Sequence, residues 1–168
     1  MDKKYVITDK QMNIGGRKFF QVRALRDIGN VKTGYFGGYV ENEHNLSQEG
    51  NCWIEPMVVL MDNARVENDA QVTGDSVIRD KAIVKDNALV SDAVICDNVI
   101  VKDDAFIIGG KYEFQDITIK ENISIKGYLK GTIVVGGDTV FEGQDGLDIE
   151  TDISIGLSNT EGCQNETD

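Results

Sequence analysis

From Cys52 to Gly110 the hydrophobic and polar positions repeat every six residues, in ten consecutive units of which one, residues 88–92, has only five. The first place of each unit is small or β-branched: Cys52, Val58, Ala64, Ala70, Ser76, Ala82, Ala88, Ala93, Val99 and Ala105. The third place is always aliphatic: Ile54, Leu60, Val66, Val72, Ile78, Val84, Val90, Ile95, Val101 and Ile107. The last two places are mostly Asp, Asn, Gly or Lys, which favour turns.

Apolar residues two apart predict short strands, and the period of six predicts a corner after each strand. An α-helix would need apolar spacings of three and four, which these columns do not supply. A unit of six residues cannot bury its own apolar pair, so the units must stack on one another. The missing residue between Ala88 and Ala93 predicts one tighter corner.

Within the repeats an aliphatic residue is followed four places later by a small one, as in Val66 and Ala70, Val72 and Ser76, and Val84 and Ala88. In this pattern the chain resembles the hexapeptide-repeat proteins. The resemblance implies an all-β, left-handed parallel β-helix with three hexads in each triangular coil. Residues 52–110 would then form a little over three coils, stacked about 4.8 Å apart.

Residues 1–51 precede the repeats and predict an amino-terminal β cap. Ile14-Gly15-Gly16-Arg17 is typical of a hairpin turn, and Lys18 to Leu25 alternates like a strand. We expect this cap to cover the open first coil, whose backbone groups would otherwise be unpaired. Over residues 4–107 the chain is similar to a transferase-like group of phage and bacterial hexapeptide-repeat proteins, most specifically in Arg23-Ala24-Leu25-Arg26-Asp27, Gly37-Gly38 and Asn45-Leu46-Ser47. This likeness implies a phage or prophage origin.

After Gly110 the six-residue period continues in the frame of the small first column, which now holds bulky residues: Ile117, Ile123, Leu129, Val135, Phe141, Leu147 and Ile153. Residues 111–155 are therefore predicted to be further β structure. They either continue the helix in a wider form or fold back over it as a cap. Residues 156–168 are polar and are expected to form a flexible acidic tail.

The repeats lack the side chains that catalysis on this fold would need. The resemblance implies acyltransferases with a histidine between the coils and bound coenzyme A, or carbonic anhydrases with several zinc-binding histidines. The single histidine, His44, lies in the cap region. The three cysteines suggest neither a disulfide framework nor a metal motif, with Cys52 in the core column and Cys96 pointing outward. We therefore predict no enzyme activity and no catalytic, cofactor or metal site, with an acyl-coenzyme A-dependent acyltransferase as an alternative.

The second place of each hexad lies between the two inward columns and must face outward. From Val77 onward this place is always large and apolar, which isolated exposed residues do not explain. The predicted interface consists of Trp53, Val77, Ile83, Leu89, Val94, Ile100 and Phe106. Trp53, Leu89 and Phe106 should stack on one face, Ile83 and Ile100 on a second, and Val77 and Val94 on the third. These residues predict a homo-oligomer, dimer or trimer, or a protein partner, unless residues 111–155 cover them or β propensity alone selected them.

The formal charge of −12 is unevenly spread. Residues 1–51 carry 8 basic and 6 acidic side chains (+2), residues 52–110 carry 5 and 11 (−6), and residues 111–168 carry 4 and 12 (−8). So acidic a chain repels phosphates, which argues against direct nucleic-acid binding. The acidic corner residues are Asp69, Asp75, Asp80, Asp86, Asp92, Asp97, Asp103 and Asp104.

Two interpretations of these aspartates stay open. Asp favours tight corners for backbone reasons alone, and the calcium-repeat pattern is missing. Alternatively, a rigid acidic helix could mimic nucleic acid and block the basic groove of a host nuclease or a CRISPR effector, as an anti-CRISPR protein would.

The start MDKK has no hydrophobic signal core, and no apolar run reaches the length of a membrane span. We expect a cytoplasmic protein, in the host cytoplasm if it is phage-encoded. The sequence thus predicts a non-catalytic structural or protein-interaction module. The acidic inhibitor and the acyltransferase are its alternatives.

Overall fold

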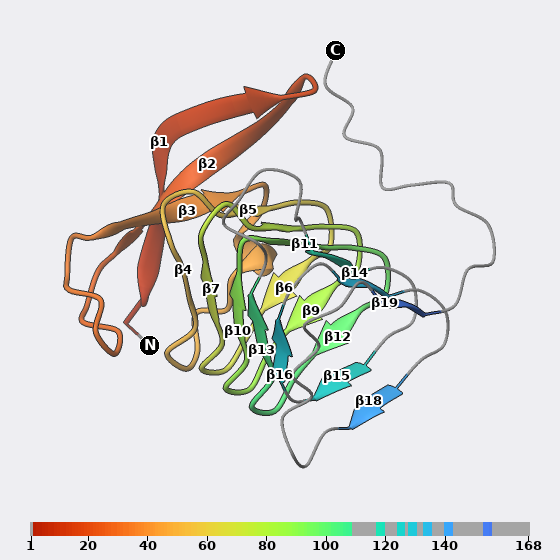
Figure 1. The fold of residues 1–168 in the computed structure, drawn as a ribbon. Helices are drawn as coiled ribbons and strands as arrows, with labels where there is room; N and C mark the ends of the chain where they lie inside the picture. The colour runs from red at the N-terminus through yellow and green to blue at the C-terminus, as the bar shows by residue number, and fades with distance from the viewer. Residues whose placement is uncertain are drawn as a thin grey trace.

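The computed structural model describes residues 2–108 and, beyond them, the backbone of six further strands between residues 117 and 155. The protein is all-β, and its parallel sheets form a β-solenoid of about four turns, which confirms the predicted β-helix (Figure 1). The described strands form one nine-stranded and two five-stranded sheets.

The elements, in chain order, are β1 (Tyr5–Ile14), β2 (Arg17–Ala24), β3 (Phe36–Val40), a short 3-10 turn η1 (Glu43–Asn45), β4 (Trp53–Ile54), β5 (Val59–Leu60), β6 (Arg65–Val66), β7 (Gln71–Thr73), β8 (Val77–Ile78), β9 (Ile83–Val84), β10 (Leu89–Ser91), β11 (Ala93–Ile95), β12 (Ile100–Val101), β13 (Phe106–Ile108), β14 (Ile117–Ile119), β15 (Ser124–Lys126), β16 (Tyr128–Lys130), β17 (Ile133–Val135), β18 (Val140–Glu142) and β19 (Ile153–Ile155).

Each turn of the solenoid contributes one strand to each sheet. Along one face the order is β4-β7-β10-β13-β16, and along a second it is β6-β9-β12-β15-β18. The third face carries β5-β8-β11-β14-β17-β19, to which β3, β2 and β1 are joined at the amino-terminal end. Equivalent hexad places align from turn to turn, as in the row Ile54, Val72, Val90 and Ile107.

The core is formed by the two inward columns that the period predicts. Every residue of the aliphatic third column is 0% exposed, and no residue of the small first column exceeds 2%. Small residues fit there because the chain turns a corner just before each of them. Burial of both columns in every turn gives a continuous core, which no single hexad could form alone.

The corners explain why Asp and Asn end so many hexads. Among residues 2–108, seven non-glycine residues have positive φ: Asp62, Asn68, Asp80, Asp86, Asp92, Asp97 and Asp103, with φ between 53° and 61°. This left-handed conformation is costly for most side chains but is tolerated by Asp, Asn and Gly. The five-residue unit gives the tighter corner that the sequence predicts, since Asp92 alone separates β10 from β11.

The amino-terminal region forms the predicted hairpin and covers the first coil. Strands β1 and β2 pair antiparallel around Gly15 and Gly16, whose φ values are 53° and 76°. Strand β3 then pairs in parallel with β5, and Leu46 forms a parallel bridge to Val66 of β6. The cap therefore supplies the missing strand on two sides of the first coil, while the hairpin extends away from it (Figure 1). Tyr5, Val22, Val40 and Leu46 join the same hydrophobic core as the repeats.

The strands after residue 108 continue the stack. Strand β14 pairs in parallel with β11, β15 with β12, and β16 with β13. Of the two alternatives for residues 111–155, these strands favour continuation of the helix. The predicted tail, residues 156–168, lies outside the described residues.

Candidate functional site

The outward places of the hexads form rows that run along the helix on all three faces. Leu89 aligns with Phe106, Ile83 with Ile100, and Val77 with Val94. All six side chains are half-buried on the single chain. The predicted stacking of these residues on three faces is confirmed.

Trp53 lies in the row of Leu89, because both residues align with Gln71. The expectation that Trp53 is exposed in this row is wrong, because it is only 1% exposed. The indole is covered by the cap. A Cβ atom at Gly37 would lie 2.7 Å from Cζ2 of Trp53, so the glycine lets β3 approach the ring directly. Within the described residues the indole Nε1 has no hydrogen-bond partner. Trp53 therefore holds the cap to the first coil.

The three faces differ in the residues that flank the outward rows. Beside Ile83 and Ile100 the fourth places of the hexads are Lys85 and Lys102. Beside Leu89 the fourth places are uncharged: Thr73, Ser91 and Ile108 align with one another on β7, β10 and β13. Gln71 and Leu89 are also aligned on this face. Over these three strands the face of β7, β10 and β13 thus carries no charged side chain in its outward places.

The corner aspartates form hydrogen-bonded ladders along the helix. Oδ2 of Asp62 accepts the backbone N–H of Asp80 at 3.2 Å, and Oδ2 of Asp80 accepts the N–H of Asp97 at 3.2 Å. At the next corner Oδ2 of Asp86 accepts the N–H of Asp103, also at 3.2 Å. Each carboxylate therefore satisfies a backbone donor in the neighbouring coil.

The remaining acidic corner residues make related contacts. Oδ1 of Asp69 accepts the N–H of Asn51 at 3.0 Å, and Oδ1 of Asp92 accepts the N–H of Asp75 at 3.1 Å. Oδ1 of Asp104 accepts a bond from the Asn87 side chain at 3.1 Å. Asp69, Asp75 and Asp104 are exposed, and the other corner aspartates are half-buried. The turn-forming role is thus visible in the hydrogen bonds.

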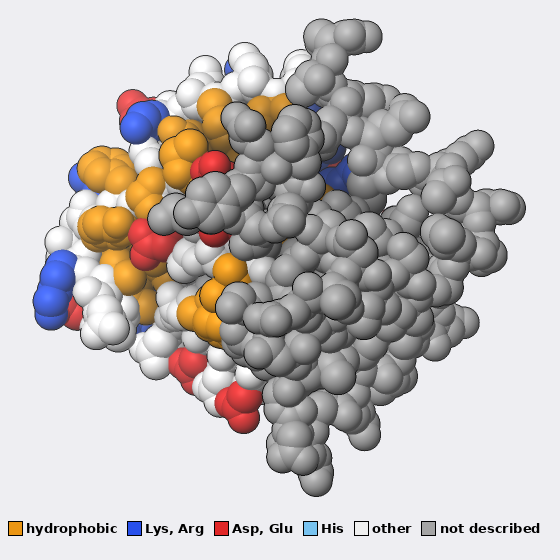
Figure 2. Space-filling view, in the orientation of Figure 1, with side chains coloured by type: hydrophobic (Ala, Val, Ile, Leu, Met, Phe, Trp, Pro, Cys, Tyr) orange, Lys and Arg blue, Asp and Glu red, His pale blue; other side chains and the backbone are white. Residues whose placement is uncertain are grey.

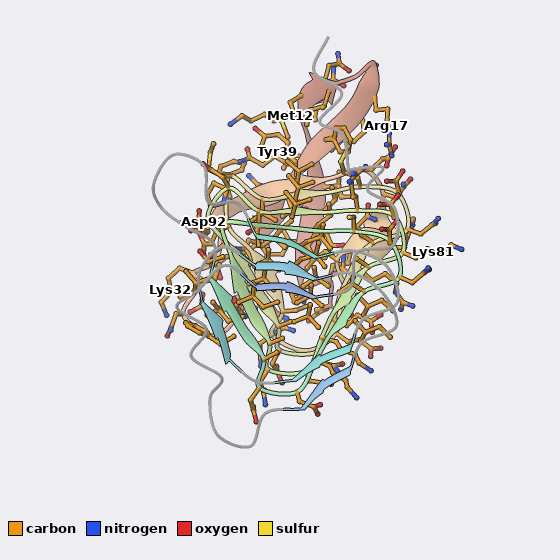
Figure 3. The ribbon with its side chains drawn as sticks, turned by 45° about the vertical axis from the view of Figure 1, so that its right-hand side comes forward. Met12, Arg17, Lys32, Tyr39, Lys81 and Asp92 are labelled. Carbon is orange, nitrogen blue, oxygen red and sulfur yellow. The ribbon has the colours of Figure 1, made fainter. Side chains whose placement is uncertain are left out.

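A charged cluster ties the hairpin to the first coil. Nη2 of Arg17 lies 2.5 Å from Oε2 of Glu41 and 2.5 Å from Oδ1 of Asp62. Figure 3 shows Arg17 on the hairpin, above the coils whose corners carry Lys81 and Asp92. His44 lies beside this cluster, with Nε2 3.1 Å from the carbonyl oxygen of Asp62. Among the residues that the structure describes, no group of three or more His, Cys, Asp or Glu side chains could hold a metal ion.

Sequence reasoning missed an exposed apolar patch that consists of three residues of the cap and one residue of the first hexad. Leu25, Tyr35, Phe36 and Met57 are 43%, 44%, 44% and 67% exposed. Figure 2 shows hydrophobic side chains gathered on the cap side of the molecule. The Arg23 guanidinium lies 5.9 Å from the ring centroid of Phe36, and the Tyr35 hydroxyl donates to Glu55 at 2.9 Å. Three of the four residues lie before the repeats and Met57 at a corner, so no periodic signal marks the patch.

The sequence also gave no sign of a buried pair formed by Lys4 and Cys52. Both residues are 0% exposed, and Nζ of Lys4 lies 3.1 Å from Sγ of Cys52. Burial lowers the pKa of Lys4 and raises the pKa of Cys52, and it outweighs the attraction between their charged forms. Both directions favour a neutral amine beside a neutral thiol. Cys52 is thus in the core, as predicted, but it has a reactive neighbour.

Cys96 differs from its expected position. It is 0% exposed, so the expectation that it points outward is wrong, and it is not a free thiol. The side chains alternate only within the strands, and Cys96 begins the corner that follows β11.

No family model matches the chain, and no curated protein matches it. Across the described part of the chain, no helix has the length and apolar character to cross a membrane.

Proposed function

We propose that the protein is a non-catalytic structural and protein-interaction module that associates with a second copy of itself. The observation that supports this proposal is the uncharged face of β7, β10 and β13, where Leu89 and Phe106 align in one outward row and Thr73, Ser91 and Ile108 in the other. Interface cores are depleted in charged residues relative to the rest of a protein surface.

The shape of the face suits pairing with an identical face. Parallel strands that align turn by turn present flat rows of side chains about 4.8 Å apart. Two copies related by a two-fold axis can lay these rows against each other, which gives an isologous, closed contact. The face of β6, β9 and β12 suits this arrangement less well, because Lys85 and Lys102 would face like charges in the partner.

The test is the molar mass of two variants that add the same charge to different faces. Leu89→Asp places a carboxylate in the proposed contact and should weaken association by about 3–5 kcal/mol, which is roughly two to four decades in Kd. Ile83→Asp is the matched control on the lysine-flanked face and should leave the mass unchanged. Melting curves of both variants check that the fold is kept.

Light scattering on both variants decides between the outcomes. A monomeric Leu89→Asp protein and an associated Ile83→Asp protein support the proposal. An associated Leu89→Asp protein contradicts it.

No specific observation favours the acidic inhibitor, because corner carboxylates already accept hydrogen bonds from backbone N–H groups of adjacent coils. For the acyltransferase alternative, the only histidine lies on the cap beside Asp62 rather than between coils. Phage or prophage origin and a cytoplasmic location are proposals that rest on the sequence alone.

A further inference from the structure

The cap is held to the first coil by a buried lysine that lies directly before β1. Nζ of Lys4 donates to the carbonyl oxygens of Glu49 at 3.1 Å and Cys52 at 3.0 Å. Its third neighbour is Sγ of Cys52, at 3.1 Å. The contact joins two points 48 residues apart in the chain.

This arrangement is unusual for a lysine with a purely structural role. Lysine is almost never fully buried without a carboxylate partner, because its charged form loses hydration. Here the three polar contacts are two carbonyls and a thiol. Burial lowers the pKa of Lys4 and so favours the neutral amine, whose nitrogen lone pair is available for bond formation.

The pair also lies close to solvent, although neither residue reaches it. Lys3, Glu49, Gly50 and Asn51 are exposed, and they are sequence neighbours of the two buried residues.

We propose that Lys4 and Cys52 form a reversible covalent N–O–S bridge under oxidising conditions, which locks the amino-terminal cap onto the first coil. The co-reactant is dioxygen or hydrogen peroxide. With hydrogen peroxide two equivalents are consumed: both O–O bonds break, one oxygen atom is inserted between nitrogen and sulfur, and the other three leave as three molecules of water with the hydrogens of the peroxide, the amine and the thiol. With dioxygen, the amine and the thiol each lose one hydrogen, one oxygen atom is inserted between nitrogen and sulfur, and the second oxygen atom leaves as water with both hydrogens. One N–H bond, one S–H bond and the O–O bond break, while one N–O bond and one O–S bond form. Dithiothreitol reverses the bridge by reducing it to the amine, the thiol and water.

The bridge would act as a latch on the cap. It closes a loop of 48 residues that contains the hairpin, β3 and η1. By analogy with a disulfide of this loop length, the oxidised form should melt about 5–15 °C above the reduced form. The loop includes the exposed patch of Leu25, Tyr35 and Phe36, so the latch would also restrict the segments that carry this patch.

The test compares the full-length protein after reduction with dithiothreitol and after exposure to hydrogen peroxide. In the oxidised wild type we expect intact mass to rise by one oxygen less two hydrogens. Peptide mapping should show Lys4 joined to Cys52, with tryptic cleavage after Lys4 lost, and dithiothreitol should restore both the mass and the cleavage. The Cys52→Ser and Lys4→Arg variants should not form this product.

Two results would overturn the proposal. One is Cys52 carrying whole oxygen atoms while Lys4 is still cleaved by trypsin. The other is an unmodified Cys52 after oxidation that does modify exposed methionines such as Met57. Both readings come from the wild-type protein, so they do not depend on whether the variants fold.

Discussion

Substitutions at Asp80 separate the two explanations for the acidity of the helix. Asp80 has a φ of 61°, and its Oδ2 accepts the N–H of Asp97 in the next coil at 3.2 Å. Asp80→Ala removes the acceptor. It also leaves a residue in the left-handed region that has no polar side chain to stabilise this conformation by a local hydrogen bond. Asp80→Gly removes the acceptor but adopts this φ freely. Asp80→Asn keeps both an acceptor oxygen and tolerance of the left-handed region, and it removes only the charge.

The expected costs follow from these two contributions. Loss of the hydrogen bond should cost about 1 kcal/mol at this half-buried corner. The left-handed conformation should cost Ala about 1 kcal/mol more than Asp. The free energy of unfolding should therefore fall by about 2 kcal/mol for Ala, about 1 kcal/mol for Gly, and less than about 0.5 kcal/mol for Asn. For a domain of this size the Ala variant should melt roughly 4–8 °C below the wild type.

Urea denaturation of the three variants beside the wild type tests the order Asn, Gly, Ala. If Asn costs as much as Ala, the carboxylate charge rather than the corner geometry stabilises this position, and the explanation by backbone conformation is wrong. If the order holds, Asn substitutions at Asp80, Asp86 and Asp97 neutralise the surface without loss of fold. The triple variant can then be used to test binding to a basic nuclease.

The cap and its turns provide three further predictions. Gly38→Ala should lower stability by about 1–3 kcal/mol, since its Cβ would lie 2.4 Å from the carbonyl oxygen of Val58; a melting temperature equal to that of the wild type would refute this close approach. Hydrogen bonds from Lys32 and the following threonine hold the pKa of Asp27 at about 2, below its ordinary 3.8, so the turn gains stability above pH 3.8 and loses it as the pH falls through about 2. Lys32→Ala should raise this pKa in an NMR titration, and an unchanged value would contradict the assignment. Arg17→Ala should speed amide exchange in β1 and β2 but not in β7 to β12, and Arg17→Lys should restore only part of the protection because lysine lacks the planar fork.

The repeats could be predicted from sequence because each coil imposes the same two inward columns on the chain. Trp53 shows where this reasoning stops. Its place in the hexad predicts that Trp53 points away from the core columns. The side chain is nevertheless buried, because β3 packs against it, and β3 lies more than a dozen residues earlier in the chain and outside the repeats. The contact between Lys4 and Cys52 has the same origin, since it joins a cap residue to a repeat residue across 48 positions. Contacts between the cap and the repeats produce no repeating pattern in the sequence, so the period cannot predict them.

The six-residue period also fails to predict which inward column each residue occupies after residue 108. Ile125 aligns with Val101 in the aliphatic column, and Leu129 aligns with Ile107 in the same column, although Leu129 follows Ile125 by only four positions. The sequence places Leu129 in the first column instead. A constant period of six misassigns the column wherever a corner gains or loses residues.

The molar mass of the wild-type protein in solution shows whether the protein associates with itself. One chain weighs 18.5 kDa. If the uncharged face of β7, β10 and β13 binds a second copy, sedimentation equilibrium should give a mass that rises with concentration towards twice that value. A mass of 18.5 kDa at every concentration, up to the highest that can be measured, would contradict the account.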